Sequence, residues 1–564
     1  MQIMKKSIQA DKLTTKFPNG KIGLHPCTFS IEANTMVAIL GPSGCGKTTL
    51  LKTLAGVIPN SSGKIIIAGK ELGTNYELLK THIGYVPQHD HHAIHYDLTV
   101  KECLTFSARL RLPDLTQAQQ DAKVDSLIRK LNIEKQKNNL IRNLSGGQQK
   151  RVSIAVELLI DPIVLFLDEP TSPLDPQTIS EFLKILKGLT LNGTTVVMVT
   201  HKPEDLSYMD ECFVMGVGGY LVYKGPPKNV VTNFSKDNIL DVYQLLDSDS
   251  VSHYAQKYFL ENQVLENAGN WNDVKLSSER NVNYLSQFLY LSYRNLVRKI
   301  NARISSLITI LQAPIIATLM ILIFEDIDQI VLFFIAISAI WFGTNNAAKE
   351  IVEELPYEKY NTSIYVRERM YNLGIIPYIL SKVMILSLLG VIQSFLFIGI
   401  LYLKYKNSAV PWENFTMAFL WMSFTILVAS LLGLVLSAFS KDKEQVMSII
   451  PIALIPQIMI AGVIVNISKL TIIAPASYLT ISRWSTTGLA RIQANMEKNP
   501  LFPSGKTIAP LRENMGSTYE YEFGFSAESV EFEYYVLLAH VLFYFILIYF
   551  KLRDRDLYRD NFNK

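Results

Sequence analysis

Five long stretches without a charged residue constrain this chain more than any other feature. They cover residues 304–324, 329–348, 383–403, 414–440 and 445–468. Each can cross the hydrocarbon core of a bilayer, because about 20 helical residues span roughly 30 Å. A shorter run at 534–550 gives a sixth crossing when it is extended to about Phe532, which leaves Glu533 at the interface. We therefore expect an all-α, six-helix transmembrane domain over 304–564, with a long outer loop at 469–531.

The lysine and arginine distribution orients these helices. If the N-terminal half is cytoplasmic, the segments 294–303, 349–372, 441–444 and 551–564 lie inside and carry most of the basic residues near the membrane. The short outer loops carry only Lys404 and Lys406. Six crossings with both ends inside agree with this charge bias. The sequence thus predicts a multi-pass membrane protein.

The first 303 residues are of a different kind. Residues 1–234 alternate helical stretches with short runs that are apolar on both faces, such as 35–40, 163–167 and 194–199. Such runs are typical of buried parallel strands in an α/β sheet. We expect a polar linker or peripheral helical segment at 235–283 and an amphipathic connecting helix at 284–303, lying along the cytoplasmic membrane surface.

Composition and net charge limit the classes of molecule that this chain is expected to bind. The chain is 49% hydrophobic and 18% charged, and its net charge of +4 is small for 564 residues. That charge balance gives no support for nucleic-acid binding and leaves lipid and nucleotide as the expected partners. Four cysteines, Cys27, Cys45, Cys103 and Cys212, have spacings that suit neither a zinc site nor a disulfide framework, so we expect reduced thiols.

The clearest chemical motif is a phosphate-binding loop that follows the strand at 35–40 and precedes a helical stretch. Glycines let backbone N–H groups surround the β-phosphate, and the helix presents its positive N-terminus. Lys47 is placed to reach the β- and γ-phosphates, and Thr48 to ligate Mg²⁺. The predicted nucleotide-binding residues are Gly41, Pro42, Ser43, Gly44, Cys45, Gly46, Lys47, Thr48 and Thr49.

Two further motifs follow in order. The residues Ser145, Gly146, Gly147 and Gln148 come where a helix over 149–160 begins, which predicts a second anion-binding helix start. The run 163–167 then ends in Asp168 and Glu169, and acids at the carboxyl end of a strand point into the ligand crevice of an α/β sheet. Asp168 is the expected Mg²⁺ holder, and Glu169 is expected to polarise the attacking water.

These residues resemble the nucleotide-binding domain of ABC transporters over the whole of 1–234, with Leu144–Gln148 as the family's signature. The resemblance implies ATP and Mg²⁺ as cofactors. It makes Gln88 the lid glutamine that contacts Mg²⁺ and water, and His201 the switch histidine at the γ-phosphate. It also implies that Asp175 is an inter-subunit aspartate and that Phe17 stacks on adenine.

The domain order narrows the resemblance to the ABCG, or white, subfamily with its ABC-2 type membrane part, and to its bacterial relatives. One phosphate loop and one signature on a chain imply a dimer of half-transporters, since this family sandwiches each ATP between two subunits. All catalytic residues are present, which favours a homodimer. The outer loop has none of the cysteines usual in eukaryotic members, which favours a bacterial inner-membrane protein.

A histidine-rich segment allows a second hypothesis. His89, Asp90, His91, His92 and His95 could bind a transition metal, although their spacing matches no zinc pattern. A polar contact loop beside Gln88 explains the position of the segment without a metal, and we favour that interpretation.

The residue composition of the membrane domain suggests the class of transported substrate. Its polar residues are few, and we expect no buried charge pair there, which argues against an ion-coupled carrier and favours a lipid-like or drug-like substrate. The candidates for a substrate path between two membrane halves are Phe333, Ile337, Trp341, Pro456, Gln457 and Met459. For any single one of them, packing between helices or contact with lipid is the more ordinary role. The alternative to export is an ATPase that passes mechanical work or a signal to a partner protein.

Overall fold

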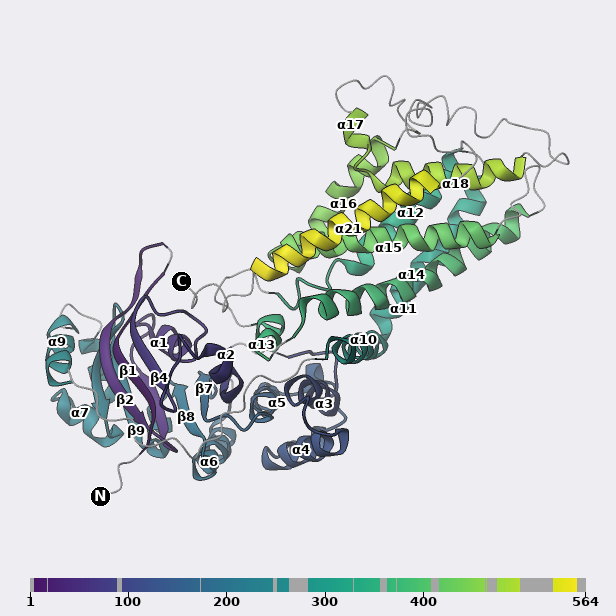
Figure 1. Ribbon diagram of the computed structural model, residues 1–564. Helices are drawn as coiled ribbons and strands as arrows, with labels where there is room; N and C mark the ends of the chain where they lie inside the picture. Colours follow the sequence, from purple (N-terminus) through teal and green to yellow (C-terminus); the bar gives the residue numbers. More distant parts are fainter. Residues whose placement is uncertain are drawn as a thin grey trace. The chain divides into compact units, whose positions relative to one another are not determined.

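The computed structural model describes residues 5–17, 19–88, 94–172, 174–246, 251–262, 283–327, 329–355, 363–371, 373–406, 415–461, 463, 474–497 and 531–554. These residues form two compact units (Figure 1). The ATPase unit comprises Met1–Asn283 together with Glu358–Leu373, and the membrane unit comprises Tyr284–Tyr357 and Gly374–Arg555. The predicted order of an α/β domain followed by a helical membrane domain is confirmed.

The core of the ATPase unit is a six-stranded sheet in the order β10-β9-β3-β8-β7-β6. Its strands are β3 (Met36–Leu40), β6 (Ile83–Val86), β7 (Val164–Asp168), β8 (Thr195–Val199), β9 (Glu211–Gly216) and β10 (Tyr220–Gly225). Strands β6, β7, β8, β3 and β9 run parallel to one another. Every residue of β3, β6, β7 and β8 is buried, as the apolar runs in the sequence predict.

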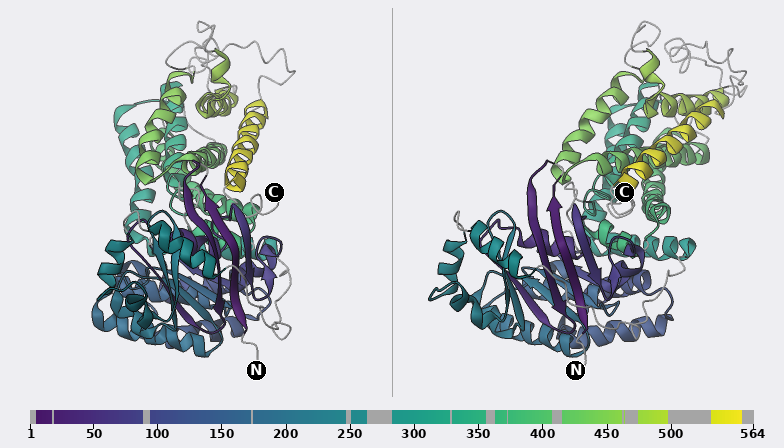
Figure 2. Two further views of the ribbon diagram at one scale, coloured as in Figure 1. Left: turned by 90° about the vertical axis from the view of Figure 1, so that its left-hand side faces the viewer. Right: turned by 60° about the vertical axis from the view of Figure 1, so that its left-hand side comes forward.

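A second sheet is antiparallel, in the order β2-β1-β4-β5. Its strands are β1 (Lys6–Lys16), β2 (Ile22–Glu32), β4 (Ser62–Ile67) and β5 (Lys70–Glu71). Figure 2 shows the long strands β1 and β2 side by side in purple. The end of β1 brings Phe17 close to the phosphate-binding loop.

Capping residues fix where the longer helices of the ATPase unit begin. The side chains of Thr99, Thr116 and Ser145 each accept a hydrogen bond from the backbone N–H three residues on. The backbone N–H of each cap residue in turn donates to the Glu or Gln side chain at that position. The longer helices are α1 (Lys47–Leu54), α3 (Val100–Arg111), α4 (Gln117–Lys130), α5 (Gly146–Leu158) and α6 (Pro176–Leu191). Shorter segments are α2 (Tyr76–Leu79), α7 (Val230–Asn233) and 3₁₀ turns at Lys80–His82, Glu134–Gln136, Ile141–Asn143, Pro203–Tyr208 and Pro227–Asn229.

The polar stretch after residue 234 contains two helices, α8 (Ile239–Leu245) and α9 (Val251–Glu261). The Tyr258 hydroxyl of α9 donates to the carbonyl oxygen of Thr28 at 3.3 Å, and Val251 packs against Gly216 of β9. These contacts extend the compact ATPase unit beyond Phe234 into the predicted linker. The described parts of this segment, 235–246 and 251–262, are therefore peripheral and helical, an option that the composition also allowed.

One short helix belongs to the ATPase unit although it comes late in the chain. Helix α13 (Ile364–Met370) lies between two membrane helices in sequence, yet Glu358–Leu373 groups with the ATPase unit. The predicted membrane domain, 304–564, is thus interrupted by a segment that folds with the nucleotide-binding part.

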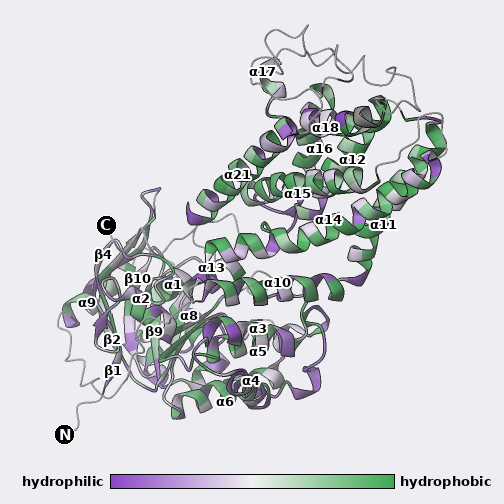
Figure 3. Cartoon of the chain, turned by 45° about the vertical axis from the view of Figure 1, so that its right-hand side comes forward, coloured by the Kyte–Doolittle hydropathy of each residue, from purple (hydrophilic) through white to green (hydrophobic). Residues whose placement is uncertain are grey.

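The membrane unit is helical, and Figure 3 shows its long helices mostly in the hydrophobic colour. Among the described residues, five helices are long and apolar enough to cross a bilayer. Helix α16, at 17 residues, covers only the first part of the run 445–468, most of whose remainder lies outside the described residues. Six crossings therefore remain a prediction. The helices are α10 (Tyr284–Asn301), α11 (Arg303–Ile323), α12 (Gln329–Ala347), α14 (Ile375–Tyr405), α15 (Phe415–Phe439), α16 (Lys443–Met459), α17 (Ala474–Ser477), α18 (Ile481–Glu497) and α21 (Glu531–Asp554).

Within the predicted outer loop, α18 packs against α12, α15 and α21. Its small residues permit close approach, since a Cβ on Gly488 would collide with the ring of Trp421. The Trp421 indole donates to the carbonyl oxygen of Ser485 at 3.0 Å. The Ser, Thr and Arg residues of α18 led to the prediction of a loop from the sequence. In the structure α18 is a helix that packs in the helical core.

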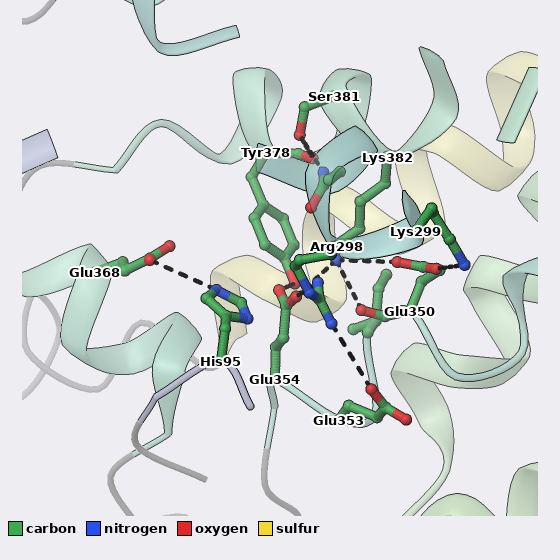
Figure 4. A network of polar contacts seen from close by, with 12 residues as sticks. His95, Arg298, Lys299, Glu350, Glu353, Glu354, Glu368, Tyr378, Ser381 and Lys382 are labelled. Atoms are coloured by element: carbon green, nitrogen blue, oxygen red, sulfur yellow. Dashed lines mark hydrogen bonds and ion pairs between the residues drawn. The ribbon is translucent and has the colours of Figure 1, made fainter. Parts of the chain in front are cut away.

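The expectation that the membrane domain has no buried charge pair is wrong. In α18, Arg491 lies 2.8 Å from Glu533 of α21, and their side chains are 9% and 0% exposed. A larger cluster joins α10, α14 and the turn after α12 (Figure 4). Arg298 and Lys382 both contact Glu354, at 2.6 and 3.1 Å. The partners come from distant parts of the chain, so no local pattern shows that they pair.

Candidate functional site

The phosphate-binding loop joins β3 to α1 and has the predicted form. Gly41, Gly44 and Gly46 have φ angles of 143°, 75° and 98°, which L side chains rarely adopt. A Cβ on Gly41 would collide with the backbone of Met215, whereas one on Gly44 would meet nothing within 4 Å. The loop is thus packed against Met215 at Gly41 and faces open space at Gly44. Lys47, which starts α1, donates to the carbonyl oxygens of Gly41 and Pro42 at 3.0 and 2.8 Å.

The first acid lies beside this loop. Asp168 ends β7, and its Oδ1 accepts a hydrogen bond from Thr48 Oγ1 at 3.0 Å, across 120 residues of sequence. Burial raises the pKa of Asp168, and the Thr48 hydrogen bond opposes that rise. Mg²⁺ prefers oxygen ligands and takes one or two carboxylates together with substrate phosphates. A buried carboxylate beside a hydroxyl fits that requirement.

Two of the predicted catalytic side chains, Gln88 and His201, meet at one carboxylate oxygen of the third, Glu169. Gln88 Nε2 donates to Glu169 Oε2 at 3.0 Å, and His201 Nδ1 lies 3.6 Å from the same oxygen. Glu169 has a φ of 44°, a left-handed conformation that is unusual for a residue with a side chain. This backbone turns Glu169 toward Gln88 and His201 immediately after the buried strand. The geometry suits a carboxylate that orients a water molecule.

The signature forms the first turn of α5 rather than the loop before it. The helix begins at Gly146, three residues earlier than the apolar pattern predicts, because Ser145 Oγ accepts from Gln148 N at 3.4 Å. Gln148 Oε1 in turn accepts from Ser145 N at 3.1 Å. Ser145 and Gly146 are exposed and Gly147 is buried. An exposed helix N-terminus with free N–H groups suits an anion.

Two more predicted residues have defined places. Asp175 caps α6, with Oδ1 accepting from Thr178 N at 3.0 Å, and its carboxylate is exposed. Phe17 is half-buried at the end of β1, beside Gly23, which in turn adjoins Thr49 of α1. Neither the inter-subunit role of Asp175 nor the adenine stacking of Phe17 is tested by these contacts, and both remain predictions.

Sequence reasoning missed Asp205, which is fully buried. Its Oδ2 accepts from Thr171 Oγ1 at 2.8 Å and from Thr200 Oγ1 at 2.6 Å. Thr171 is two residues after Glu169, and Thr200 directly precedes His201. Asp205 therefore ties together the segments that carry both catalytic side chains. It lies in an ordinary polar stretch, so nothing local marks it.

A buried lysine was also missed. Lys150 of α5 has no exposed surface, and its Nζ donates to the carbonyl oxygens of Pro87 and Gln88 at 2.8 and 3.1 Å. The only sequence signal is a lysine next to the apolar run that follows the signature.

Helix α13 attaches to the same helix α5. Glu157 Oε1 accepts from Arg111 Nη2 at 2.9 Å and from Arg367 Nε at 3.1 Å, and the Tyr371 hydroxyl donates to Glu157 Oε2 at 3.1 Å. Burial by itself would raise the pKa of Glu157, but the two guanidinium groups outweigh it and hold that pKa at about 2. The carboxylate is therefore ionised, and it links α13 to the signature helix.

The metal hypothesis for the histidine-rich segment gains no support. Residues 89–93 lie outside the described residues. His95 is buried, with its Nε2 4.0 Å from Glu368 Oε1 (Figure 4). Within the described ranges, no group of three or more His, Cys, Asp or Glu side chains is placed to hold a metal ion. All four cysteines are free and buried, as expected.

The predicted substrate-path residues differ in their surroundings. Phe333 and Gln457 are buried, and Gln457 accepts from the backbone N–H of Ser482 at 3.0 Å. Ile337 and Trp341 are half-buried, and Pro456 and Met459 are exposed in the single chain. Phe333 and Gln457 thus pack within one chain, while the other four remain candidates.

Comparison with known proteins finds family models that match both parts of the chain. A family model described as "ABC transporter" matches residues 24–172, and one described as "ABC-2 type transporter" matches residues 286–494. An ABC transporter ATP-binding/permease protein of Mycobacterium tuberculosis is 26% identical over 515 residues, which is 88% of this chain and 58% of the relative. ABC transporter G family member 28 of Arabidopsis thaliana is 37% identical over 223 residues, or 38% of this chain and 20% of its own.

A third relative is matched over almost its whole length. This protein of Methanocaldococcus jannaschii, described as an ABC transporter ATP-binding protein, is 32% identical over 292 residues, 50% of this chain and 98% of the relative. The solved structure of cbiO1 from Clostridium perfringens, part of the ABC transporter complex cbiONQ, is 29% identical and covers 45% of this chain and 99% of its own, with a TM-score of 0.39. The chain therefore covers 58% of the length of the Mycobacterium tuberculosis relative and 20% of the length of the Arabidopsis thaliana relative.

Proposed function

The chain belongs to the ABC transporter family, with an organisation similar to the family's G branch, and we propose that it is an ATP-hydrolysing half-transporter. In this proposal two copies dimerise and export a lipid-like or hydrophobic substrate across the membrane. The observation that carries the proposal is that Gln88 and His201 both meet one carboxylate oxygen of Glu169. This site lies on a chain that also has a phosphate-binding loop and five candidate membrane helices among its described residues.

In this proposal different residues bind the phosphates, orient the attacking water and hold Mg²⁺. The backbone N–H groups of residues 43–48 and the Lys47 ammonium hold the phosphates of ATP. Glu169 accepts a hydrogen bond from the attacking water, while Gln88 and His201 keep its carboxylate in place. Mg²⁺ would be held by Thr48 and Asp168, with Gln88 nearby, and would neutralise charge on the β- and γ-phosphates.

The dimer is supported by the incomplete site on one chain. The signature at Ser145–Gln148 is at the exposed N-terminus of α5, where it can meet a nucleotide held by a second copy. Closure around ATP would move α5, and α13, which binds Glu157 of α5, would carry that motion toward the membrane helices. The ATPase unit then lies in the cytoplasm, and the membrane is a bacterial inner membrane.

The substrate class rests on the composition of the membrane unit. The five candidate spans among its described residues are predominantly apolar. The buried Arg491–Glu533 pair is internally neutralised and so offers no free charge to a cargo ion. An apolar or amphipathic cargo suits such a lining.

The test uses the purified full chain in lipid vesicles, with ATP hydrolysis and oligomeric state measured for the native chain and for Glu169→Gln. A dimer that hydrolyses ATP, is stimulated by apolar cargo and is trapped with bound ATP by Glu169→Gln would support export. Hydrolysis stimulated by a partner protein and not by any cargo would favour the alternative, an ATPase that transmits mechanical work or a signal. A native chain that is monomeric and inactive would contradict the homodimer.

A further inference from the structure

We infer that Lys150 is a positioning residue that fixes Gln88 against Glu169 and links both to the signature helix. The inference rests on the proposed ATP hydrolysis for its kinetic part and on contacts within the ATPase unit for its structural part. Lysine is almost never fully buried unless its charge is satisfied. A 0% exposed Lys150 in the middle of a helix therefore needs a reason.

The first step is what Lys150 binds. Strand β6 ends at Val86, and beyond it the carbonyl groups of Pro87 and Gln88 no longer have a strand partner. Lys150 Nζ donates to both, at 2.8 and 3.1 Å. Hydrogen bonds from a charged donor are stronger than neutral ones, and burial strengthens them further. The main chain at Gln88 is thus held from α5 by one buried ammonium group.

The second step concerns the contact that the Gln88 side chain makes from this restrained main chain. From the same residue, the Gln88 side chain reaches Glu169 Oε2 at 3.0 Å. Gln88 is exposed, so the described residues cover its side chain only in part. The two carbonyl contacts restrict its backbone. Moving that backbone by about 1 Å would break the 3.0 Å hydrogen bond to Glu169, and errors of that size can cost about 10²-fold in rate.

The third step concerns the position of Lys150 within α5. Lys150 is five residues after Ser145, the residue that caps α5 and starts the signature. A helix moves as a rigid body over so short a distance. Any shift of the signature toward a nucleotide therefore moves the ammonium group, and with it the Gln88 main chain. Lys150 makes the orientation of Glu169 depend on the position of the signature.

The test compares Lys150→Met with a matched control in the full chain. Methionine keeps the apolar stem and removes the ammonium donors. Lys80→Met is the control, because Lys80 is 7% exposed and pairs with Glu77 at 2.5 Å, without contacting Gln88. We expect Lys150→Met to lower kcat by about 10- to 100-fold with little change in ATP affinity measured by equilibrium binding. Lys80→Met should leave both nearly unchanged.

A double-mutant cycle separates positioning from general destabilisation. If Lys150 acts through Gln88, then Lys150→Met should add nothing to the loss caused by Gln88→Ala, because contacting residues that work as one unit are not additive. Losses that multiply, or a fall in ATP affinity equal to the fall in kcat, would overturn the inference.

A readout that does not need hydrolysis keeps the two proposals distinct. Hydrogen exchange in a peptide covering Ile83–Gln88 should speed up in Lys150→Met and not in Lys80→Met. Unchanged exchange there would overturn the structural part whatever the ATPase result. A native chain that binds ATP without hydrolysing it would contradict the proposed function, and the exchange comparison would still decide the role of Lys150.

Discussion

At the residue scale, the site is a set of long-range contacts around a strained glutamate. The phosphate-binding loop, Asp168, Glu169 and the signature could all be predicted, because each is a local pattern with a physical reason. Asp205 and Lys150 could not, because their partners are separated from them by up to 63 residues and nothing nearby in the sequence marks them. The two missed residues position the predicted ones.

Replacing Glu169 by Gln should slow ATP hydrolysis by about 10²-fold or more, since a positioned acid–base group contributes that much. The amide keeps the shape but cannot accept the proton or orient the water as a carboxylate does. ATP binding should persist. Phosphate release by the purified chain is the measurement, with exposed Glu204→Gln as the control, and full activity in Glu169→Gln would contradict the assignment.

Asp205→Ala should lower kcat by about 10-fold with ATP affinity retained, because one carboxylate oxygen of Asp205 accepts from the hydroxyls of both Thr171 and Thr200. Alanine removes both acceptor oxygens, whereas asparagine would keep one. Steady-state kinetics over a range of ATP concentrations distinguishes the two constants. A change in KM alone would show that Asp205 serves nucleotide binding instead.

At the scale of elements, the apolar runs predict the strands and most of the membrane helices, and what they miss follows from tertiary contacts. Helix α18 was hidden because small and polar residues, which suit close helix packing in a membrane, look like a loop in a hydropathy pattern. The charge cluster around Glu354 was hidden because its members come from α10, the turn after α12, and α14. Periodicity describes each element alone and not its neighbours.

Gly488→Ala tests the packing of α18. The new Cβ would strike the Trp421 ring, and overpacking of a filled core costs roughly 1–3 kcal/mol. We expect a lower thermal midpoint in detergent. Gly399→Ala in α14 is the matched control, because a Cβ there meets nothing within 4 Å. Equal midpoints for the two variants would show that α18 is not packed as described.

The Glu157 cluster predicts a pH dependence. The pKa of Glu157 in the folded chain, about 2, lies below the usual glutamate value, so its ionised form stabilises the fold. That stabilisation is complete above the unfolded pKa, about 4.3, and is lost as the pH falls toward 2. Glu157→Gln should destabilise the ATPase unit near neutral pH by about 3–5 kcal/mol and flatten the acid dependence of thermal unfolding. Exposed Glu261→Gln should do neither.

At the scale of the whole molecule, the arrangement of one phosphate-binding loop and one signature on a chain makes pairing between copies the decisive question. The domain order and the resemblance to the G branch both come from the sequence. Stoichiometry and cargo do not, because they depend on surfaces between chains.

Complementation tests this pairing. Lys47→Ala and Gly146→Asp should each abolish hydrolysis when one variant is present alone. Mixed dimers should recover part of the activity, because one of their two sites combines an intact loop with an intact signature. Co-expression with two different affinity tags isolates the mixed species. No recovery in that species would mean that each chain carries a complete site by itself.

The place of α13 has a consequence for how the protein is made. Its residues, Ile364–Met370, leave the ribosome only after α11 and α12, so two membrane helices are synthesised before the last element of the ATPase unit appears. Until then, Glu157 has Arg111 but neither Arg367 nor Tyr371. The nucleotide-binding part therefore completes its fold only once the first membrane hairpin has been synthesised. A fragment that stops at residue 283 should be less stable than the same region in the full chain.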